Sequence, residues 1–184
     1  MKKIILLALA AFSLVSCGDE DATQTVKQGP YSIELPSYMQ KTTGLNEDAS
    51  LQFQHAVREL YIVVIDEPKS EVENAINQMG LYDLYTYDLN GYANLATDNV
   101  KDAMEIKSIP PYIEKKINGL PAKEVSFNGT IEGVPEIYYK FGFVEGKNNY
   151  YQIMTWTLAN RKSKYEKTMQ AMVDSFKETD KSTK

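Results

Sequence analysis

The sequence predicts an α+β fold in which an antiparallel β-sheet is flanked by helices. Runs of alternating apolar and polar residues form two groups, within residues 31–65 and 122–158. Segments with helical spacing lie between these groups and after the second one. Gly-containing turns separate the strands of the second group. Grouped strands with helices between the groups are typical of an antiparallel sheet, whereas strict strand–helix alternation predicts a parallel one.

The first group of strands begins with YSIEL at residues 31–35, which alternates and then stops at Pro36. Residues 37–49 are polar and predict a loop. Two more strands are expected at residues 51–57 and 60–65, since the first alternates and the second is rich in β-branched residues. The two are expected to pair through a turn near Arg58.

A first helix is predicted to begin at Ser70, because Glu73 stands three residues later as in a capping box. Gly80 is a natural stop. The residues expected on its buried face are Val72, Ala75, Ile76 and Met79.

Residues 89–104 admit two interpretations. Asn90-Gly91 favours a hairpin, since tyrosines alternate before it. A helical stripe favours a second helix, and we adopt it because alternation fails after Gly91 whereas the stripe continues. Gly91 inside a helix then costs about 1 kcal/mol relative to alanine. The stripe consists of Leu89, Tyr92, Ala93, Ala96, Val100, Ala103 and Met104.

The C-terminal half predicts three strands and a closing helix. Pro110-Pro111 breaks the chain, and Asn118-Gly119 predicts a turn. Strands are expected at residues 122–131, 134–145 and 149–158. The closing helix follows from apolar residues spaced by four, three and four, namely Tyr165, Met169, Met172 and Phe176.

The order and texture of these elements resemble the Mog1/PsbP-like fold, an α/β/α sandwich. The resemblance spans about residues 31–177 and is carried by YSIELP, YYQIMTWT and YEKTMQAMVDSFK rather than by a diagnostic motif. Its members share no catalytic residues, so the resemblance implies a fold and no activity.

The N-terminal residues have the features of a secretory leader. Lys2 and Lys3 precede an apolar run over residues 4–15, which is too short to span a bilayer. The following LVSC, residues 14–17, resembles the lipobox of bacterial lipoproteins. The resemblance implies that the leader (1–16) is removed and that Cys17 carries diacylglycerol and a fatty acyl group such as palmitate. A plain signal peptide cut near Ser16 or Gly18 is the alternative.

Four regions are therefore expected: signal peptide 1–16, lipidated Cys17 with a flexible tether through residue 29, one α+β domain over 30–178, and a charged tail 179–184. Gly18 after the cysteine favours the outer over the inner membrane, by similarity to enterobacterial lipoproteins. Residues 19–21, DED, resemble acidic surface-export signals of Bacteroidetes lipoproteins, or else form a merely solvated tether.

Composition and motifs exclude several function classes. The net charge is −5, without a basic stripe, so nucleic acid is not an expected partner. The sequence has one Cys and one histidine, His55, and lacks GxSxG and HExxH, so no nucleophile, metal or other cofactor site is predicted. A calcium site at Asp83, Asp88 and Asn90 is too loosely spaced.

Tyrosine supplies the candidate binding surface, because its flat ring and polar tip suit contacts with peptides or glycans. The chain has 13 tyrosines. The candidates are Tyr138, Tyr139, Tyr150, Tyr151 and Trp156, on neighbouring predicted strands. Adjacent tyrosines in a strand point to opposite faces, so the same rings can instead pack the core.

We therefore expect a membrane-anchored, non-catalytic module that binds an envelope protein, peptide or glycan. One alternative is a hydrolase that uses the carboxylates of Glu132 and Glu136. Another is a small-molecule carrier with a pocket between sheet and helices, which close aromatic packing without a cavity would contradict.

Overall fold

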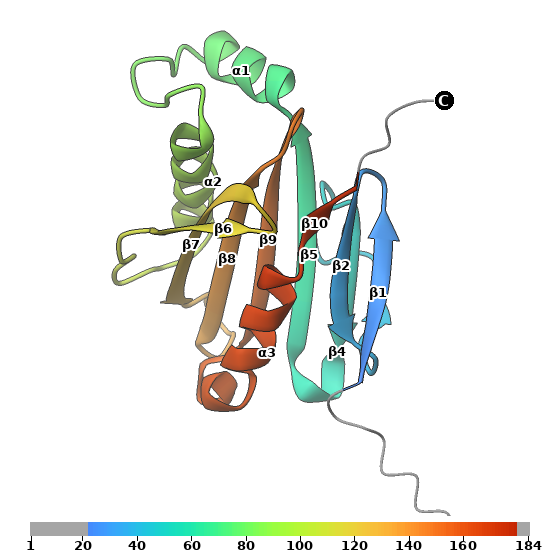
Figure 1. Cartoon of the computed structure of the whole chain (residues 1–184). Helices are drawn as coiled ribbons and strands as arrows, with labels where there is room; N and C mark the ends of the chain where they lie inside the picture. The colour runs from blue at the N-terminus through green and yellow to red at the C-terminus, as the bar shows by residue number, and fades with distance from the viewer. Residues whose placement is uncertain (1–21, 180–184) are drawn as a thin grey trace, which may run out of the picture.

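The computed structural model describes residues 22–179, so the leader, Cys17, the DED stretch and residues 180–184 lie outside it (Figure 1). The described residues form ten strands, three α-helices and two short 3-10 helices. The helices are α1 (Lys69–Gln78), α2 (Leu89–Ala103) and α3 (Lys162–Asp174). The strands are β1 (Thr23–Gln28), β2 (Tyr31–Pro36), β3 (Gln40–Lys41), β4 (Leu51–His55), β5 (Leu60–Pro68), β6 (Ile113–Ile117), β7 (Leu120–Gly129), β8 (Ile137–Glu145), β9 (Asn149–Leu158) and β10 (Lys177–Glu178).

Seven strands form one antiparallel sheet in the order β3-β4-β5-β9-β8-β7-β6. A smaller antiparallel sheet has the order β1-β2-β10. The chain makes β5, crosses through α1 and α2, and then builds β6 to β9, so that β9 returns to pair with β5. The predicted α+β class with helices flanking an antiparallel sheet is confirmed.

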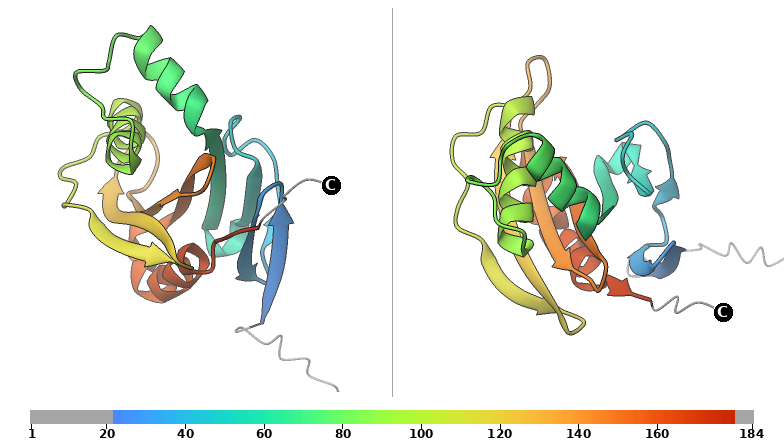
Figure 2. Two further views of the ribbon diagram at one scale, coloured as in Figure 1. Left: turned by 45° about the horizontal axis from the view of Figure 1, so that its top comes forward. Right: turned by 90° about the horizontal axis from the view of Figure 1, so that it is seen from above.

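The large sheet is covered on both faces. Helices α1 and α2 lie against one face, while α3 and the small sheet cover the other (Figures 1 and 2). Strand β9 shows how the sequence directs this arrangement. Tyr151 and Ile153 point into the core below α3, and Tyr150 and Met154 point toward α2, as the alternation predicts.

The prediction of a flexible tether over residues 17–29 is wrong for residues 23–28. These residues form β1, an edge strand that pairs with β2 and places Val26 opposite Ile33. The sequence of β1 lacks an apolar alternation that would predict a strand, because one side of β1 faces solvent and the other is only half buried. The folded domain thus begins near Thr23, earlier than the expected residue 30.

Strands β3, β6 and β10 were not predicted. β3 and β10 are two-residue strands, and β6, with the sequence IEKKI, is a largely exposed edge strand. It pairs with β7 through the predicted turn, where Asn118 and Gly119 both have positive φ, 49° and 89°. That backbone matches a two-residue hairpin.

Helix α1 differs from its prediction in two respects. It begins at Lys69, one residue early, and no side chain caps its start, so the Ser70–Glu73 capping box does not form. Met79, expected on the buried face, is 71% exposed. Only Val72 and Ile76 are buried, because most of the helix lies beyond the end of β5 and not over the sheet (Figure 1).

Helix α2 confirms the helical interpretation of residues 89–104. The Asp88 carboxylate accepts a hydrogen bond from the backbone N–H of Gly91 at 2.9 Å and caps the helix. Gly91 is needed for a steric reason, since a Cβ atom there would lie 1.8 Å from the carbonyl oxygen of Thr86.

Replacing Gly91 with alanine is therefore expected to destabilise the domain by about 1–3 kcal/mol, the range for overpacking. Helix propensity alone predicts the opposite sign, a gain of about 1 kcal/mol. Urea unfolding of both proteins measures the difference. Asn94→Ala, in the same helix, is the control, and a Gly91→Ala protein as stable as the parent would contradict the close contact.

Candidate functional site

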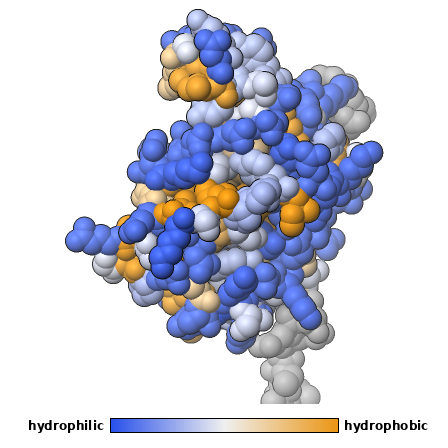
Figure 3. All heavy atoms as spheres, turned by 90° about the vertical axis from the view of Figure 1, so that its left-hand side faces the viewer, coloured by the Kyte–Doolittle hydropathy of each residue, from blue (hydrophilic) through white to orange (hydrophobic). Residues whose placement is uncertain are grey.

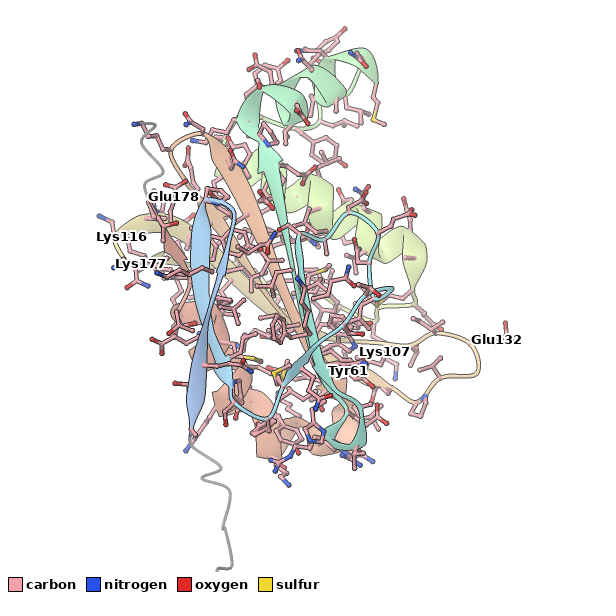
Figure 4. All side chains as sticks on the ribbon, turned by 90° about the vertical axis from the view of Figure 1, so that its right-hand side faces the viewer. Tyr61, Lys107, Lys116, Glu132, Lys177 and Glu178 are labelled. Carbon is pink, nitrogen blue, oxygen red and sulfur yellow. The ribbon has the colours of Figure 1, made fainter. Side chains whose placement is uncertain are left out.

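The four tyrosines of the predicted binding surface are buried. Tyr138, Tyr139, Tyr150 and Tyr151 are 3%, 9%, 4% and 0% exposed. Tyr138 and Tyr139 enter opposite cores, as their adjacency requires. The prediction of an exposed tyrosine surface is therefore wrong, because the helices and the small sheet cover both faces of the large sheet. Trp156 is half-buried and stacks on Tyr61 (labelled in Figure 4) with ring centroids 5.2 Å apart.

This burial has a consequence at alkaline pH. Desolvation raises the pKa of Tyr139 from 10.0 to about 12. Desolvation, aided by the Glu166 carboxylate that accepts a hydrogen bond from the Tyr138 hydroxyl, raises the pKa of Tyr138 to about 12 as well. Above pH 10 the unfolded chain loses these protons while the folded chain keeps them, so the free energy of unfolding falls as pH rises from about 10 to 12.

Urea unfolding at a series of pH values measures this loss. Tyr139→Phe removes one of the tyrosines whose pKa is raised, without removing a described hydrogen bond, so the fall of its unfolding free energy above pH 10 is expected to be less steep. Identical slopes for the parent and Tyr139→Phe would contradict the assigned burial of this hydroxyl.

A buried ionic cluster lies between the large sheet and α3. The Lys140 ammonium donates to Glu124 at 2.9 Å and to Gln170 at 2.7 Å, and both residues of the ion pair are 5% exposed. Gln170 and Lys115 also donate to Glu124, at 2.7 and 3.3 Å. Burial alone would raise the pKa of Glu124, but the hydrogen bonds from Gln170 and Lys140 hold it below its ordinary value.

The ionic cluster lines a hollow of about 840 Å³, which we call the α3 pocket. Four of its six charged groups have partners within the chain: Glu124 and Lys140 bind each other, Glu166 accepts from Tyr138 at 2.9 Å, and Lys162 lies 3.7 Å from Glu166. Such satisfied groups stabilise the fold and have little remaining capacity for a ligand.

A second hollow, the α2 pocket, lies between the large sheet, α1, α2 and the loop that precedes β4. Its volume is about 700 Å³. Apolar side chains form much of its wall, and several residues with carboxylate or amide side chains complete the lining. The pocket is lined by Asn46, Asp48, Ile65, Asp66, Glu67, Glu71, Val72, Ala75, Tyr92, Leu95, Ala96, Asn99, Val100, Ala103, Met104, Gln152 and Met154.

Gln152 is the unusual residue of the α2 pocket. It is 6% exposed, and its side-chain amide makes no hydrogen bond to any residue in the range 22–179. Its neighbours across the sheet are Ile65 and Phe143, which offer no side-chain polar group. The amide is not sealed from solvent, since the Thr157 hydroxyl oxygen is the side-chain atom of residues 22–179 that is fully buried without a partner; the Gln152 amide opens onto the pocket.

The α2 pocket is also acidic. Three carboxylates line it, those of Asp48, Glu67 and Glu71, and none of them has an ion pair within the described part of the chain. Asp66 also belongs to the lining, but alternation along β5 directs its side chain to the other face, the face of Tyr151. The lining set contains neither lysine nor arginine. The buried Tyr92 ring stacks on Tyr150, and its hydroxyl donates to Glu67 at 2.7 Å, which fixes that carboxylate at the pocket wall.

The other sequence candidates are not brought together. Glu136 lines the α3 pocket, whereas Glu132 lies at the tip of the β7–β8 loop and lines a separate shallow hollow (Figure 4). They do not form a carboxylate pair for hydrolysis. His55 accepts a hydrogen bond from the backbone of Arg58 at 3.2 Å and packs edge-on against Tyr38, which is a structural role.

Residues 22–179 contain no group of three or more His, Cys, Asp or Glu side chains able to hold a metal. None of the helices among these residues has the length and apolarity needed to cross a membrane.

The connection between α1 and α2 carries exposed apolar side chains. Met79, Tyr82 and Leu84 are 71%, 59% and 70% exposed. Figure 3 shows apolar surface over this connection, at the top of the view. Sequence reasoning left residues 81–87 unassigned, and the structure makes them a loop of turns that projects with α1 away from the sheet (Figure 1).

Comparison with known proteins gives the fold. No protein-family model matches the chain, and no curated protein matches its sequence. Cyanobacterial PsbP (CyanoP) from Synechocystis sp. PCC 6803 matches in structure with a TM-score of 0.58 and 12% identity, over 90% of this chain and 98% of that one. A structure from Bacteroides thetaiotaomicron matches with a TM-score of 0.53 and 11% identity, over 84% of this chain and 47% of that one.

LpqN of Mycobacterium tuberculosis, described as involved in cell envelope biogenesis, is more distant, with a TM-score of 0.43 and 9% identity over 86% of this chain and 91% of that one. At these identities a likeness shows the fold and nothing about activity. The PsbP part of the resemblance in the sequence is thus confirmed: this chain has a PsbP-like fold.

Proposed function

We propose that this protein is a lipid-anchored, non-catalytic binding module of the bacterial cell envelope, and that its ligand lies in the α2 pocket. The single observation that carries the proposal is the amide of Gln152, which opens onto that pocket from a residue only 6% exposed and makes no hydrogen bond to residues 22–179. The anchoring half of the proposal is supported by the LVSC motif at residues 14–17.

The amide supports ligand binding for a geometric reason. Gln152 has an apolar residue opposite it on each neighbouring strand, so its amide does not bind the fold. The amide opens onto the pocket instead. A ligand in the pocket can donate to this amide and accept from it.

The shape of the site supports the same proposal. A volume of about 700 Å³ lies within the usual range for small-molecule sites. An apolar wall with a few convergent polar groups is the usual composition of such sites. A small-molecule carrier needs a pocket of this kind, and a module that binds an envelope protein, peptide or glycan can use it for a terminal group of that partner.

The test is Gln152→Met, which removes the amide and keeps the length of the side chain. We expect the free energy of unfolding to change by less than about 1 kcal/mol, because the amide makes no hydrogen bond within the fold that the variant would lose. The full chain is purified from its own membranes, and small molecules released on denaturation are identified by mass spectrometry. A compound that accompanies the parent is expected to be absent from the variant.

Gln54→Met is the matched control. Gln54 lies on β4 opposite Tyr61, on the same face of the sheet as Gln152 but outside the lining of the α2 pocket. This control is expected to retain the compound. Equal recovery from parent, Gln152→Met and control, or a Gln152→Met protein that is markedly less stable, would contradict the proposed role of the amide.

A further inference from the structure

We infer that the α2 pocket selects an organic cation with an apolar body, such as a primary amine on an aromatic or aliphatic group. The inference rests on the proposed function, because it names the class of ligand that the pocket binds. It follows from three observations: the charge of the lining residues, the apolar wall, and the position of Gln152.

The charge of the lining is one-sided. Asp48, Glu67 and Glu71 bring three formal negative charges, and no lysine or arginine stands among the residues that line the pocket. By contrast, in the α3 pocket Lys107, Lys140 and Lys162 face Glu124, Glu136 and Glu166 in equal number. Carboxylates that lack an internal cation attract a cationic ligand and repel an anionic one.

The carboxylate best placed to contact a ligand is Glu67. Its Oε2 atom accepts from the Tyr92 hydroxyl at 2.7 Å. The Tyr92 ring is 2% exposed and is held by stacking on Tyr150, with centroids 4.7 Å apart. Its second carboxylate oxygen has no hydrogen bond to a residue of the described chain and remains available to an ammonium group.

The apolar part of the lining indicates that the ligand has an apolar group beside its positive charge. Leu95, Val100 and Met104 from α2 and Met154 from β9 line the pocket together with Ile65 and Val72. Methionine side chains adapt to ligands of irregular shape. A bare inorganic cation leaves this wall uncovered, whereas an amine with an apolar body contacts both the wall and the carboxylates.

The amide adds a third contact. Gln152 lies on β9 two residues from Met154 and on the same face of the sheet. A ligand whose apolar body covers Met154 thus comes within reach of the amide, which can donate to one of its polar groups or accept from it. One amphipathic cation can contact the carboxylates, the apolar wall and the amide at the same time.

The test uses three probes that share one ring and differ in charge: 2-phenylethylammonium, 2-phenylethanol and 3-phenylpropionate. Binding to the full chain is followed through the methyl NMR signals of its methionines, of which Met104 and Met154 line the pocket. We expect both signals to shift most with 2-phenylethylammonium. Its affinity is expected to exceed that of 3-phenylpropionate by at least tenfold, and ammonium chloride is expected to cause no comparable shift.

The matched variants remove charge inside and outside the pocket. Glu67→Gln with Glu71→Gln takes two carboxylates from the α2 pocket and keeps an acceptor for Tyr92. Glu73→Gln with Glu132→Gln removes the same charge from positions that do not line it. The first pair is expected to weaken 2-phenylethylammonium binding about tenfold and to leave 2-phenylethanol unchanged. The second pair is expected to change neither.

The outcomes separate the two claims. If 2-phenylethanol and 2-phenylethylammonium shift the Met104 and Met154 signals with equal affinity in parent and variants, the pocket binds ligands but does not select cations, and only this inference is overturned. Preference for 3-phenylpropionate, or equal shifts with ammonium chloride, overturns it as well. If none of the three probes shifts these two signals, the pocket is not a ligand site, and the proposed function fails with the inference.

Discussion

Replacing Cys17 by serine is expected to release the protein from membranes and to abolish its labelling by fatty acid. The proposed anchor consists of the acyl chains on this one sulfur and on the new amine beside it. Each buried CH₂ group contributes about 0.8 kcal/mol, and two or more chains give stable anchoring where one chain is marginal. The rest of the chain offers no other cysteine for a thioether.

The measurement is incorporation of labelled palmitate, together with the distribution of the protein between membrane and soluble fractions. Labelling of the serine variant is expected to fall to background, and the protein to move to the soluble fraction or to keep its leader. Ser13→Ala, in the same leader but outside the LVSC motif, is the control and is expected to behave like the parent. Palmitate label on the Cys17→Ser protein would overturn the lipid anchor.

Replacing Lys140 by methionine is expected to lower the free energy of unfolding by about 3–5 kcal/mol, the range for breaking a buried ion pair by removing one partner. Glu124 is 5% exposed, and the substitution removes the cation that lies closest to its carboxylate. Lys115, at 3.3 Å and shared with Asp174, compensates only in part. Urea unfolding at neutral pH measures the loss.

Two further measurements identify the cause of this loss. The double variant Lys140→Met with Glu124→Leu removes both charges, and its stability is expected to recover by at least about 2 kcal/mol, since isolated charge rather than lost volume is the main cost. A double variant less stable than Lys140→Met alone would contradict this account.

The second measurement is the pH dependence. Although burial acts to raise it, the pKa of Glu124 is held below 4.5 by Gln170 and Lys140. Its contribution to stability is therefore present above about pH 4.5 and is lost as pH falls through the lower folded-state value. The difference in the free energy of unfolding between the parent and Lys140→Met is expected to decrease below pH 4.5, because a protonated Glu124 is neutral and is not stabilised by a neighbouring cation.

Periodicity and turn chemistry predicted most of the regular elements. Strands β2, β4, β5, β7, β8 and β9 have one or two buried faces, and their apolar patterns are visible in the sequence. The edge strands β1 and β6 were missed because solvent covers much of each, which removes the apolar signal. Helix α2 was recognised from its stripe in spite of Gly91.

The candidate site was predicted less well, for a different physical reason. The sequence shows that Tyr138 and Tyr139 point to opposite faces, but only the arrangement of α2, α3 and β2 decides that both faces are covered. The signal for the α2 pocket was present as Gln152, one uncharged polar residue on a face shared with Tyr150 and Met154. The carboxylates of Glu67 and Glu71 join it only through the crossover from β5 to α1.

The pairing of β1 with β2 limits how far the folded body can stand from a bilayer. Six residue steps separate Cys17 from Thr23, where β1 starts, and a fully stretched chain of that length reaches about 20 Å. With acyl chains on Cys17 as proposed, the body is held close to the headgroups. Figure 1 shows the start of β1 at the end of the molecule opposite α1. Helix α1 and the exposed apolar loop after it therefore lie at the end of the domain farthest from the point where the proposed anchor is attached.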